Sequence, residues 1–472
     1  MAYNRRMTDS SRNGELDLAI IGGGAAGVLV AIQVLRQATS ALSLAIVEPA
    51  SQLAQGIAYA TLWPEHLLNV PAAKMSAFPD LPGDFLDYLQ QVAAYPQDTR
   101  EQLGERFVSR HHYAAYLQQR LQEAADASAA QLQVIAQPVL GLQPDDHGHR
   151  LQLGDGQVLH AAQTVLACGN SMRPLPLAGA EALPAGVVLD AWDYDGVRTL
   201  AGAQSVAIIG SGLSMADTVL ALVAGGHTGT LQVFSRHGLL PLPHAHGALP
   251  TFDPQPLLAM TLRQRMRTLS GHAQRAEAAG QPWQGVMDRI RPMGQALWRS
   301  LDEADQRRFL RHVVRYWDIH RHRIAEPVHA QLQALQARGQ LRVQRARLQH
   351  VQAQGAALQL VGHTAAGQQQ WAVQALVNAT GVETRARSLR NPLLQQLLAD
   401  GLARPGGHGL GLDSVADGDR VLDAHGRTQP RLGVLGSLRI GTLWESLAVP
   451  ELRQQAQALA TQAVAGAATA MP

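Results

Sequence analysis

The chain has 472 residues, enough for about two or three domains, and 39 basic against 37 acidic groups give a formal charge of +2. Its 46% hydrophobic and 16% charged residues exclude disorder as the main state. It contains neither an apolar run of about 20 residues nor a basic block, so we expect no membrane insertion and no nucleic-acid partner. A polar N-terminus and a single cysteine, Cys168, predict a cytoplasmic protein without a dithiol or a metal site.

The first predicted unit alternates strand, glycine turn, helix and strand. The strands are expected at 16–21 and 42–47 and the helix at 28–37, with the turn Gly22–Gly27 before the helix and Glu48 after the second strand. This is the βαβ pattern of a dinucleotide-binding domain, in which the turn and the helix N-terminus hold a pyrophosphate. An acid at the strand end accepts ribose hydroxyls and disfavours a 2′-phosphate, so the ligand is FAD or NAD(H).

A helix is expected at 113–127, strands within 131–167 and a turn-rich segment at 169–184. A second unit of the same kind then has strands at 205–209 and 231–234, a turn at 210–215 and a helix at 216–224. Two features differ from the first unit. Met215 replaces the third glycine, and Ser235-Arg236 stands where the first unit has its acid. Arginine pairs with a 2′-phosphate, which predicts NADPH, although Arg236 in a solvated turn is the alternative.

The rest of the chain is expected to hold a helical insertion at 251–340 and strands at 341–360 and 372–379. Together the two units indicate a hydride route from NADPH to FAD. The chain resembles the flavoproteins in which an NAD(P)H domain is inserted into a split FAD domain. Residues 378–381, Asn-Ala-Thr-Gly, are similar to the element at which such chains re-enter the FAD domain, and 167–170 to the exit crossing.

Within that group the chain resembles bacterial FAD/NAD(P)-binding oxidoreductases related to flavin-dependent N-hydroxylating monooxygenases. The segments that carry this resemblance are Gly56–Tyr59, His66–Ala72, Met75–Pro79, Gly212–Asp217, Tyr316–Arg323 and Gly441–Glu445. Two family features are missing, because Gly433–Gly436 is followed by Ser437 and not by aspartate, and no Phe-x-Gly-x-x-x-His fingerprint of the Baeyer–Villiger branch occurs. A single cysteine excludes the flavin disulfide reductases.

The expected cofactor contacts follow from these motifs. For FAD they are Gly22, Gly24, Ala25, Ala26, Gly27, Glu48, Gly56, His66, Asn69, Thr380, Gly381, Gly441 and Thr442, and for NADPH they are Gly210, Gly212, Ser214, Ser235 and Arg236. Gly441 and Thr442 are expected to open a helix whose N-terminus faces the flavin pyrimidine oxygen.

Five residues are catalytic candidates. Asn69 and Lys74 would hold the oxygenated flavin or an amine substrate, unless their loop only covers FAD. Trp444 would lie beside the flavin, unless it only closes its helix onto the core. His320 and Arg321 would bind a substrate carboxylate or the NADP phosphates, with an interdomain ion-pair cluster around Asp318 as the alternative.

We therefore expect an α/β fold with two Rossmann-like domains, an FAD domain at 1–190 and 366–472 and an inserted NADPH domain at 191–365. The resemblance implies an FAD-dependent, NADPH-using monooxygenase that hydroxylates a small amine or amino acid through a C4a-(hydro)peroxyflavin, with O2 as co-substrate. The alternatives are an NADPH-dependent reductase or dehydrogenase that passes electrons to a small acceptor or protein, and a redox-sensing flavoprotein. An oligomer is compatible with each of these functions.

Overall fold

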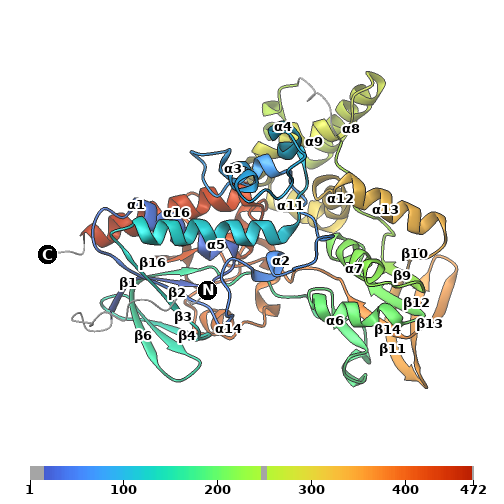
Figure 1. Ribbon diagram of the computed structural model, residues 1–472, viewed down its shortest axis with the longest axis horizontal. Coiled ribbons are helices and arrows are strands. Elements are labelled where there is room, and N and C mark those ends of the chain that lie inside the picture. The colour runs from blue at the N-terminus through green and yellow to red at the C-terminus, as the bar shows by residue number, and fades with distance from the viewer. Residues whose placement is uncertain (1–14, 246–251, 470–472) are drawn as a thin grey trace. The chain divides into compact units, whose positions relative to one another are not determined.

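The computed structural model describes residues 15–245 and 252–469, and these form two compact units (Figure 1). Of the described residues, unit 1 takes those up to 62, 70–171 and those from 384 onward, and unit 2 takes 63–69 and 172–383. The chain therefore passes between the units at 62/63, 69/70, 171/172 and 383/384. Residues 1–14 of the expected FAD domain and residue 251 of the expected helical insertion lie outside the described residues.

Unit 1 is built on a mixed sheet. Its strands are β1 (Glu15–Ile21), β2 (Ser43–Val47), β3 (Gln131–Ile135), β4 (Val139–Pro144), β5 (His149–Leu153), β6 (Val158–Leu166), β15 (Arg420–Leu422) and β16 (Thr428–Val434). Parallel strands run in the order β3-β2-β1-β6-β16. β15 pairs antiparallel with β16, and β4 and β5 form an antiparallel meander with β6. The short apolar runs of β1 and β2 are buried, as central parallel strands require.

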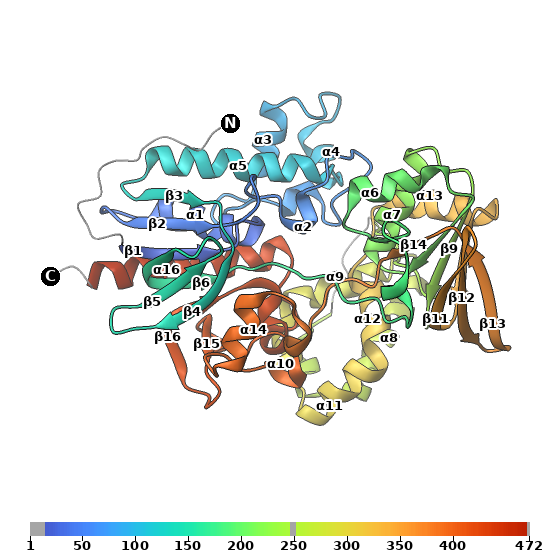
Figure 2. The same cartoon turned by 90° about the horizontal axis from the view of Figure 1, so that it is seen from below.

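Helices cover both faces of this sheet. On one face α1 (Ala25–Gln37) packs against α5 (Arg110–Ala127) and α16 (Val449–Thr469). The other face carries α14 (Pro392–Ala399) and the meander, whose leucines share a hydrophobic core with β1 and β16 (Figure 2). The short helices of this unit are α2 (Gly56–Tyr59), η1 (Ala72–Lys74), α3 (Asp84–Gln91) and α4 (Arg100–Glu105).

Unit 2 contains a fully parallel sheet and a smaller antiparallel one. The parallel strands are β7 (Val188–Asp190), β8 (Ser205–Ile209), β9 (Thr230–Ser235), β10 (Leu341–Arg345) and β14 (Ala375–Asn378), in the order β10-β9-β8-β14-β7. The antiparallel strands are β11 (Arg347–Gln354), β12 (Ala357–Thr364) and β13 (Gly367–Val373). A hydrophobic core that includes Ile209, Phe234 and Leu360 joins the two sheets. The parallel sheet also carries α6 (Tyr194–Thr199), α7 (Leu213–Ala224) and α13 (Glu326–Ala337).

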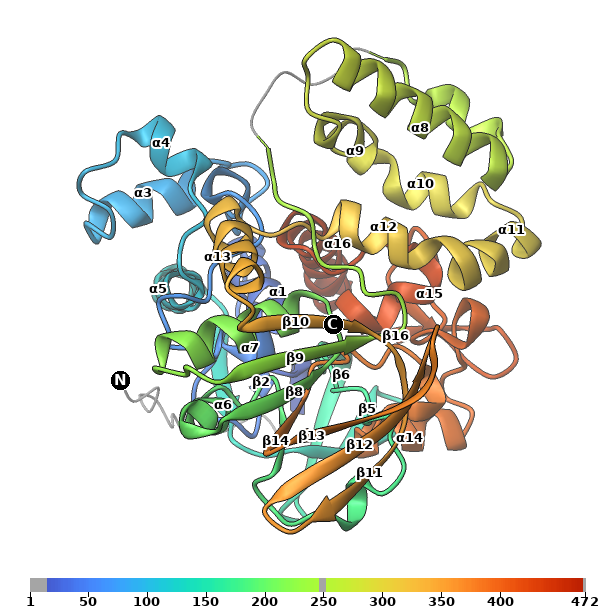
Figure 3. The same cartoon turned by 90° about the vertical axis from the view of Figure 1, so that its right-hand side faces the viewer.

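The expected helical insertion forms a separate group of helices within unit 2 (Figure 3). Its helices are α8 (Leu262–Ala278), α9 (Gln284–Ile290), α10 (Gly294–Arg299), α11 (Glu303–Arg308) and α12 (Val314–Arg321). Leu257, Ile290 and Leu297 form its core. The buried Arg265 of α8 ties the group together by donating to the carbonyls of residues 258, 260 and 297, so its charge is solvated by backbone dipoles.

The division into units differs from the expected domain boundaries at both ends of the insertion. Residues 172–190 and 366–383 lie in unit 2, where the sequence placed them in the FAD domain. The cause is strand pairing, because β7 pairs with β14 and β14 pairs with β8 inside the parallel sheet of unit 2. A boundary that depends on long-range pairing has no local signal in the sequence.

Candidate functional site

The first glycine turn connects β1 to α1, and the fold itself requires two of its glycines. Gly22 has a φ of +111°, and a Cβ there would lie 2.2 Å from the carbonyl oxygen of Ala167. A Cβ at Gly27 would lie 1.9 Å from the carbonyl oxygen of Gly22. These positions therefore need glycine whether or not a ligand binds.

Gly24 in the same turn is different, because no contact within the protein explains it. Its φ is −68°, and a Cβ there would meet only the Cα of Gly56, 3.6 Å away. Gly24, Ala25 and Ala26 are partly exposed, and α1 begins there without a side-chain cap. The open backbone and the uncapped helix N-terminus fit the pyrophosphate of a dinucleotide.

Glu48 follows β2 and is fixed beside this turn. One carboxylate oxygen accepts the N–H of Gly23 at 2.7 Å and the other accepts the N–H of Ala50 at 3.0 Å. Each oxygen keeps a further lone pair, and the side chain is only half-buried. Glu48 can therefore accept a ribose hydroxyl in the position that the sequence predicted.

The second glycine turn connects β8 to α7 and repeats the first. Gly210 has a φ of +115°, and a Cβ there would lie 2.1 Å from the carbonyl oxygen of Ala379. A Cβ at Gly212 would have nothing within 4 Å, and α7 also begins without a side-chain cap. Met215 is fully buried, so α7 packs through a large side chain where α1 uses Gly27. The open middle glycine again fits a pyrophosphate.

The end of β9 presents the predicted arginine to solvent. Arg236 is exposed and forms no ion pair with any residue that the structure describes. The hydroxyl of Ser235 accepts the N–H of Gly238 at 2.9 Å, which closes the turn after the strand. Ser214, at the start of α7, accepts the indole N–H of Trp192 at 3.3 Å, a contact that nothing in the sequence indicated.

The predicted FAD contacts Thr380 and Gly381 lie in unit 2, outside the expected second part of the FAD domain, and their contact with FAD stays a prediction. They follow β14, next to the Ala379 carbonyl that faces Gly210, and the Thr380 hydroxyl donates to Asn378 Oδ1 at 2.7 Å. The corresponding residue beside the first turn is Gly169, with a φ of +70°. The repeated Ala-x-Gly at 167–169 and 379–381 is the signal that would have revealed this equivalence.

His66, also a predicted FAD contact, packs its ring within unit 2, and its contact with FAD stays a prediction. It is fully buried, and its Nε2 lies 3.1 Å from the carbonyl oxygen of Asp217 in α7. Its ring contacts Tyr194 of α6, with 5.0 Å between centroids. The ring therefore anchors a loop to two helices of unit 2.

The whole segment 63–69 is held in the same way. Arg198 of α6 pairs with Glu65 and lies over the ring of Trp63, with 3.3 Å from Cζ to the centroid. The carbonyl oxygen of Asn69 lies 3.0 Å from His244 Nε2, and no contact of the Asn69 side chain bears on its predicted catalytic role. Residues 66–69 of the expected flavin-covering loop are thus fastened to unit 2, whereas residues 70–74 lie in unit 1.

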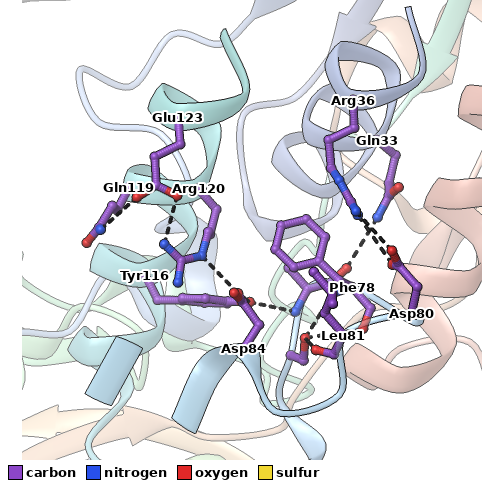
Figure 4. Close-up of polar contacts among 12 residues, drawn as sticks. Gln33, Arg36, Phe78, Asp80, Leu81, Asp84, Tyr116, Gln119, Arg120 and Glu123 are labelled. Carbon is purple, nitrogen blue, oxygen red and sulfur yellow. Dashed lines mark hydrogen bonds and ion pairs between the residues drawn. The ribbon is translucent and has the colours of Figure 1, made fainter. Parts of the chain in front are cut away.

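Lys74 ends the short helix η1 in unit 1, and its side chain is exposed. The loop that follows is braced by the contacts in Figure 4. Asp84 accepts from the Tyr116 hydroxyl at 2.6 Å and from Arg120 Nε at 2.8 Å, and the Tyr116 hydroxyl accepts the N–H of Ala77 at 2.9 Å. The 75–79 motif is therefore held against α5, while Lys74 remains accessible to a ligand.

The expected helix at Gly441 and Thr442 is also corrected. Both residues lie inside α15 (Ile440–Leu443), a single turn that ends at Trp444 with a φ of +62°. The N–H of Glu445 donates to the carbonyl of Leu443 at 2.7 Å, closing a γ-turn around Trp444, a strained conformation for a bulky residue. The turn is too short to direct a helix dipole at a flavin, and the long helix α16 begins only at Val449.

His320 and Arg321 lie at the end of α12 in unit 2. His320 Nδ1 lies 2.7 Å from the carbonyl oxygen of Tyr316, and its ring packs edge-on against Trp283. Asp318 pairs with Arg315 at 3.3 Å, and the buried Arg323 pairs with Asp288. The ion pair of Asp318 with Arg315 lies within unit 2, whereas the alternative predicted from the sequence was an interdomain cluster, and no contact tests ligand binding by His320 or Arg321.

Comparisons with known proteins bear on both units. Residues 19–171 match the FAD-NAD(P)-binding family. The chain is similar to an ornithine hydroxylase of Pseudomonas aeruginosa, with 16% identity and a TM-score of 0.64 over 96% of this chain and 99% of the other. It is also similar to an ornithine N-hydroxylase of Kutzneria sp. 744, with reduced FAD, NADP⁺ and L-ornithine (14%, TM-score 0.61, 95% and 99% covered), and to a cadaverine monooxygenase of Erwinia amylovora bound to FAD (15%, 0.58, 96% and 95%).

These similarities confirm the predicted fold, an α/β architecture with two Rossmann-like domains. The family match also confirms the predicted FAD-NAD(P)-binding character of the region that holds Gly24 and Glu48. No curated protein matches the chain in sequence. Among the described helices, none combines the length and the apolar character needed to cross a membrane.

Proposed function

We propose that this chain is an FAD-dependent monooxygenase that uses NADPH and O2 to hydroxylate the nitrogen of a small amine or amino acid. The observation that carries the proposal is the pair of open glycines. Gly24 and Gly212 have no role in packing, yet each stands at an uncapped helix N-terminus in a Rossmann-like sheet. Two dinucleotides in one chain, with a carboxylate at one strand end and an arginine at the other, suit FAD in unit 1 and NADPH in unit 2.

The chain's own residues have binding and orienting roles in this reaction. The turn Gly22–Gly27 would hold the FAD pyrophosphate, and Glu48 would hold the adenosine ribose. Gly210, Gly212, Ser235 and Arg236 would hold NADPH. When bound, the flavin supplies the redox chemistry, because it takes hydride from NADPH and activates O2. The balanced reaction is R-NH2 + NADPH + H⁺ + O2 → R-NHOH + NADP⁺ + H2O.

The structural neighbours support amine hydroxylation over other flavin chemistry. Neighbours with TM-scores from 0.58 to 0.64 are named as enzymes acting on ornithine, lysine or cadaverine, and they align over nearly the whole chain. Disulfide reduction needs two cysteines, whereas this chain has one. Lys74 and Asn69 remain our candidates for contact with the substrate, and His320, Arg321 and Trp444 for positioning it.

The test is product analysis with the FAD-loaded protein. NADPH oxidation, O2 uptake, hydroxylamine and H2O2 would be measured with ornithine, lysine, cadaverine and further amines. We expect at least one amine to yield hydroxylamine in proportion to the NADPH consumed. NADPH oxidation that passes to quinones or dyes, with no hydroxylamine from any amine, would refute the monooxygenase and favour a reductase. An Arg236→Gln variant supplied with NADH serves as the control for hydride supply, because NADH has no 2′-phosphate for Arg236 to bind.

A further inference from the structure

Arg345 is the last residue of β10, next to the end of β9. The two parallel strands are in register, so Arg345 pairs with Ser235, and the N–H of Ala346 donates to the carbonyl of Ser235 at 3.0 Å. Both strands therefore end at the same edge of the parallel sheet. This carboxyl edge is where ligands bind in doubly wound α/β folds.

The turn after β9 folds back against Arg345. Gly238 has a φ of +66°, and a Cβ at Gly238 would lie 3.3 Å from the Cβ of Arg345. The Ser235 hydroxyl fixes this turn by accepting the Gly238 N–H. Arg236 and His237 are thus carried on a turn that contacts Arg345, although more than a hundred residues separate them in sequence.

The charges at this edge are uncompensated. Arg236 and Arg345 are both exposed, and neither forms an ion pair with any described residue. Among the described residues, Arg315 of α12 has Asp318 as its ion-pair partner, at 3.3 Å. The pKa of His237 lies below its usual value, first because of partial burial and then because of the positive charges of Arg236, Arg315 and Arg345. Three guanidinium groups thus act on one imidazole.

We propose that Arg345 binds the 2′-phosphate of NADPH together with Arg236 and thereby determines the preference for NADPH over NADH. This inference rests on the proposed NADPH site of unit 2. A phosphate dianion at the end of the second strand of a Rossmann unit would lie at the edge that both arginines share. Two guanidinium groups can each donate paired hydrogen bonds to it, which one arginine in a solvated turn does not achieve.

The experiment measures binding to the FAD-loaded protein, independently of turnover. Adenosine 2′,5′-bisphosphate and 5′-AMP are the probes, because they differ only in the 2′-phosphate. We expect Arg345→Gln to weaken binding of the bisphosphate about tenfold or more and to leave 5′-AMP binding unchanged. The matched control is Arg342→Gln, which removes the same charge from the exposed start of the same strand.

The outcomes separate this inference from the proposed function. If the wild type prefers the bisphosphate and Arg236→Gln abolishes the preference while Arg345→Gln behaves like Arg342→Gln, Arg345 has no role and the NADPH site stands. If the wild type binds both probes equally, the NADPH assignment fails and this inference fails with it. If Arg345→Gln and Arg236→Gln each weaken the bisphosphate and the double variant loses less than the sum, both arginines share one phosphate.

Discussion

Replacing Gly24 by alanine should separate cofactor binding from folding. The added Cβ would have 3.6 Å to its nearest neighbour, and the backbone at φ −68° accommodates alanine. The lower entropy of the unfolded chain stabilises by about 0.4–1 kcal/mol, and the poorer helix cap of alanine opposes this by a similar amount. We therefore expect the free energy of unfolding of the cofactor-free protein to change by less than about 1 kcal/mol.

Alanine at Gly22 is the contrasting variant. It would hold an L-residue at φ +111° with its Cβ 2.2 Å from a carbonyl oxygen. The left-handed backbone and the overpacking together destabilise by about 2–5 kcal/mol. The two substitutions add the same methyl group two residues apart, so the difference between them isolates the contact that the fold makes at Gly22.

The assay combines denaturant unfolding of the cofactor-free variants with FAD titration followed by flavin fluorescence. Gly24→Ala should lose about tenfold to a hundredfold in FAD affinity, because the methyl group displaces a phosphate from charge-assisted hydrogen bonds. Gly212→Ala should leave the affinity for FAD unchanged and weaken the binding of NADPH. Full FAD affinity in Gly24→Ala would refute the assignment of this turn, and destabilisation as large as that of Gly22→Ala would show that the fold needs glycine at both positions.

Three further predictions concern single side chains. Burial lowers the pKa of His149 to about 4, so as pH falls from 6.5 toward 4 the unfolded state binds the proton first and unit 1 should lose up to about 3 kcal/mol. His149→Gln should flatten this loss in denaturant melts at stepped pH, and an unchanged slope would contradict the assignment. Lys74 is the only lysine of the chain, so acetylation should block amine turnover without changing NADPH binding, and added substrate should protect it. Burial raises the pKa of the Cys168 thiol to about 12, so a disulfide reagent at pH 8 should label the native protein orders of magnitude more slowly than the unfolded one; equal rates would refute this.

The elements whose signals are local could be predicted from the sequence. Apolar runs of five to seven residues before a glycine turn gave β1 and β8 nearly to the residue, and the acid and the arginine after the next strands gave Glu48 and Arg236. The open character of Gly24 was also implicit in the pattern, because the middle glycine of the Gly-x-Gly-x-x-Gly motif is the one at which the backbone approaches a pyrophosphate.

Features that depend on distant partners could not be predicted. Thr380 and Gly381 were expected in the FAD domain, whereas the pairing of β14 with β8 places them in unit 2. The helix expected at Gly441 ends because Trp444 adopts a positive φ, and a tryptophan in the sequence does not predict that conformation. Arg345 becomes a neighbour of Ser235 only when β10 joins the sheet.

The segment 63–69 bears on how this protein can be divided for biochemistry. A fragment that spans 172–383 would contain the parallel sheet and both helices that the segment touches, but it would lack Glu65 and His66. Arg198 would then lose its carboxylate and its aromatic cover, and the buried position of His66 would be vacated. Such a fragment should be unstable alone and regain stability when a synthetic peptide of residues 60–72 is added in trans, because unit 2 is built from two separate stretches of the chain.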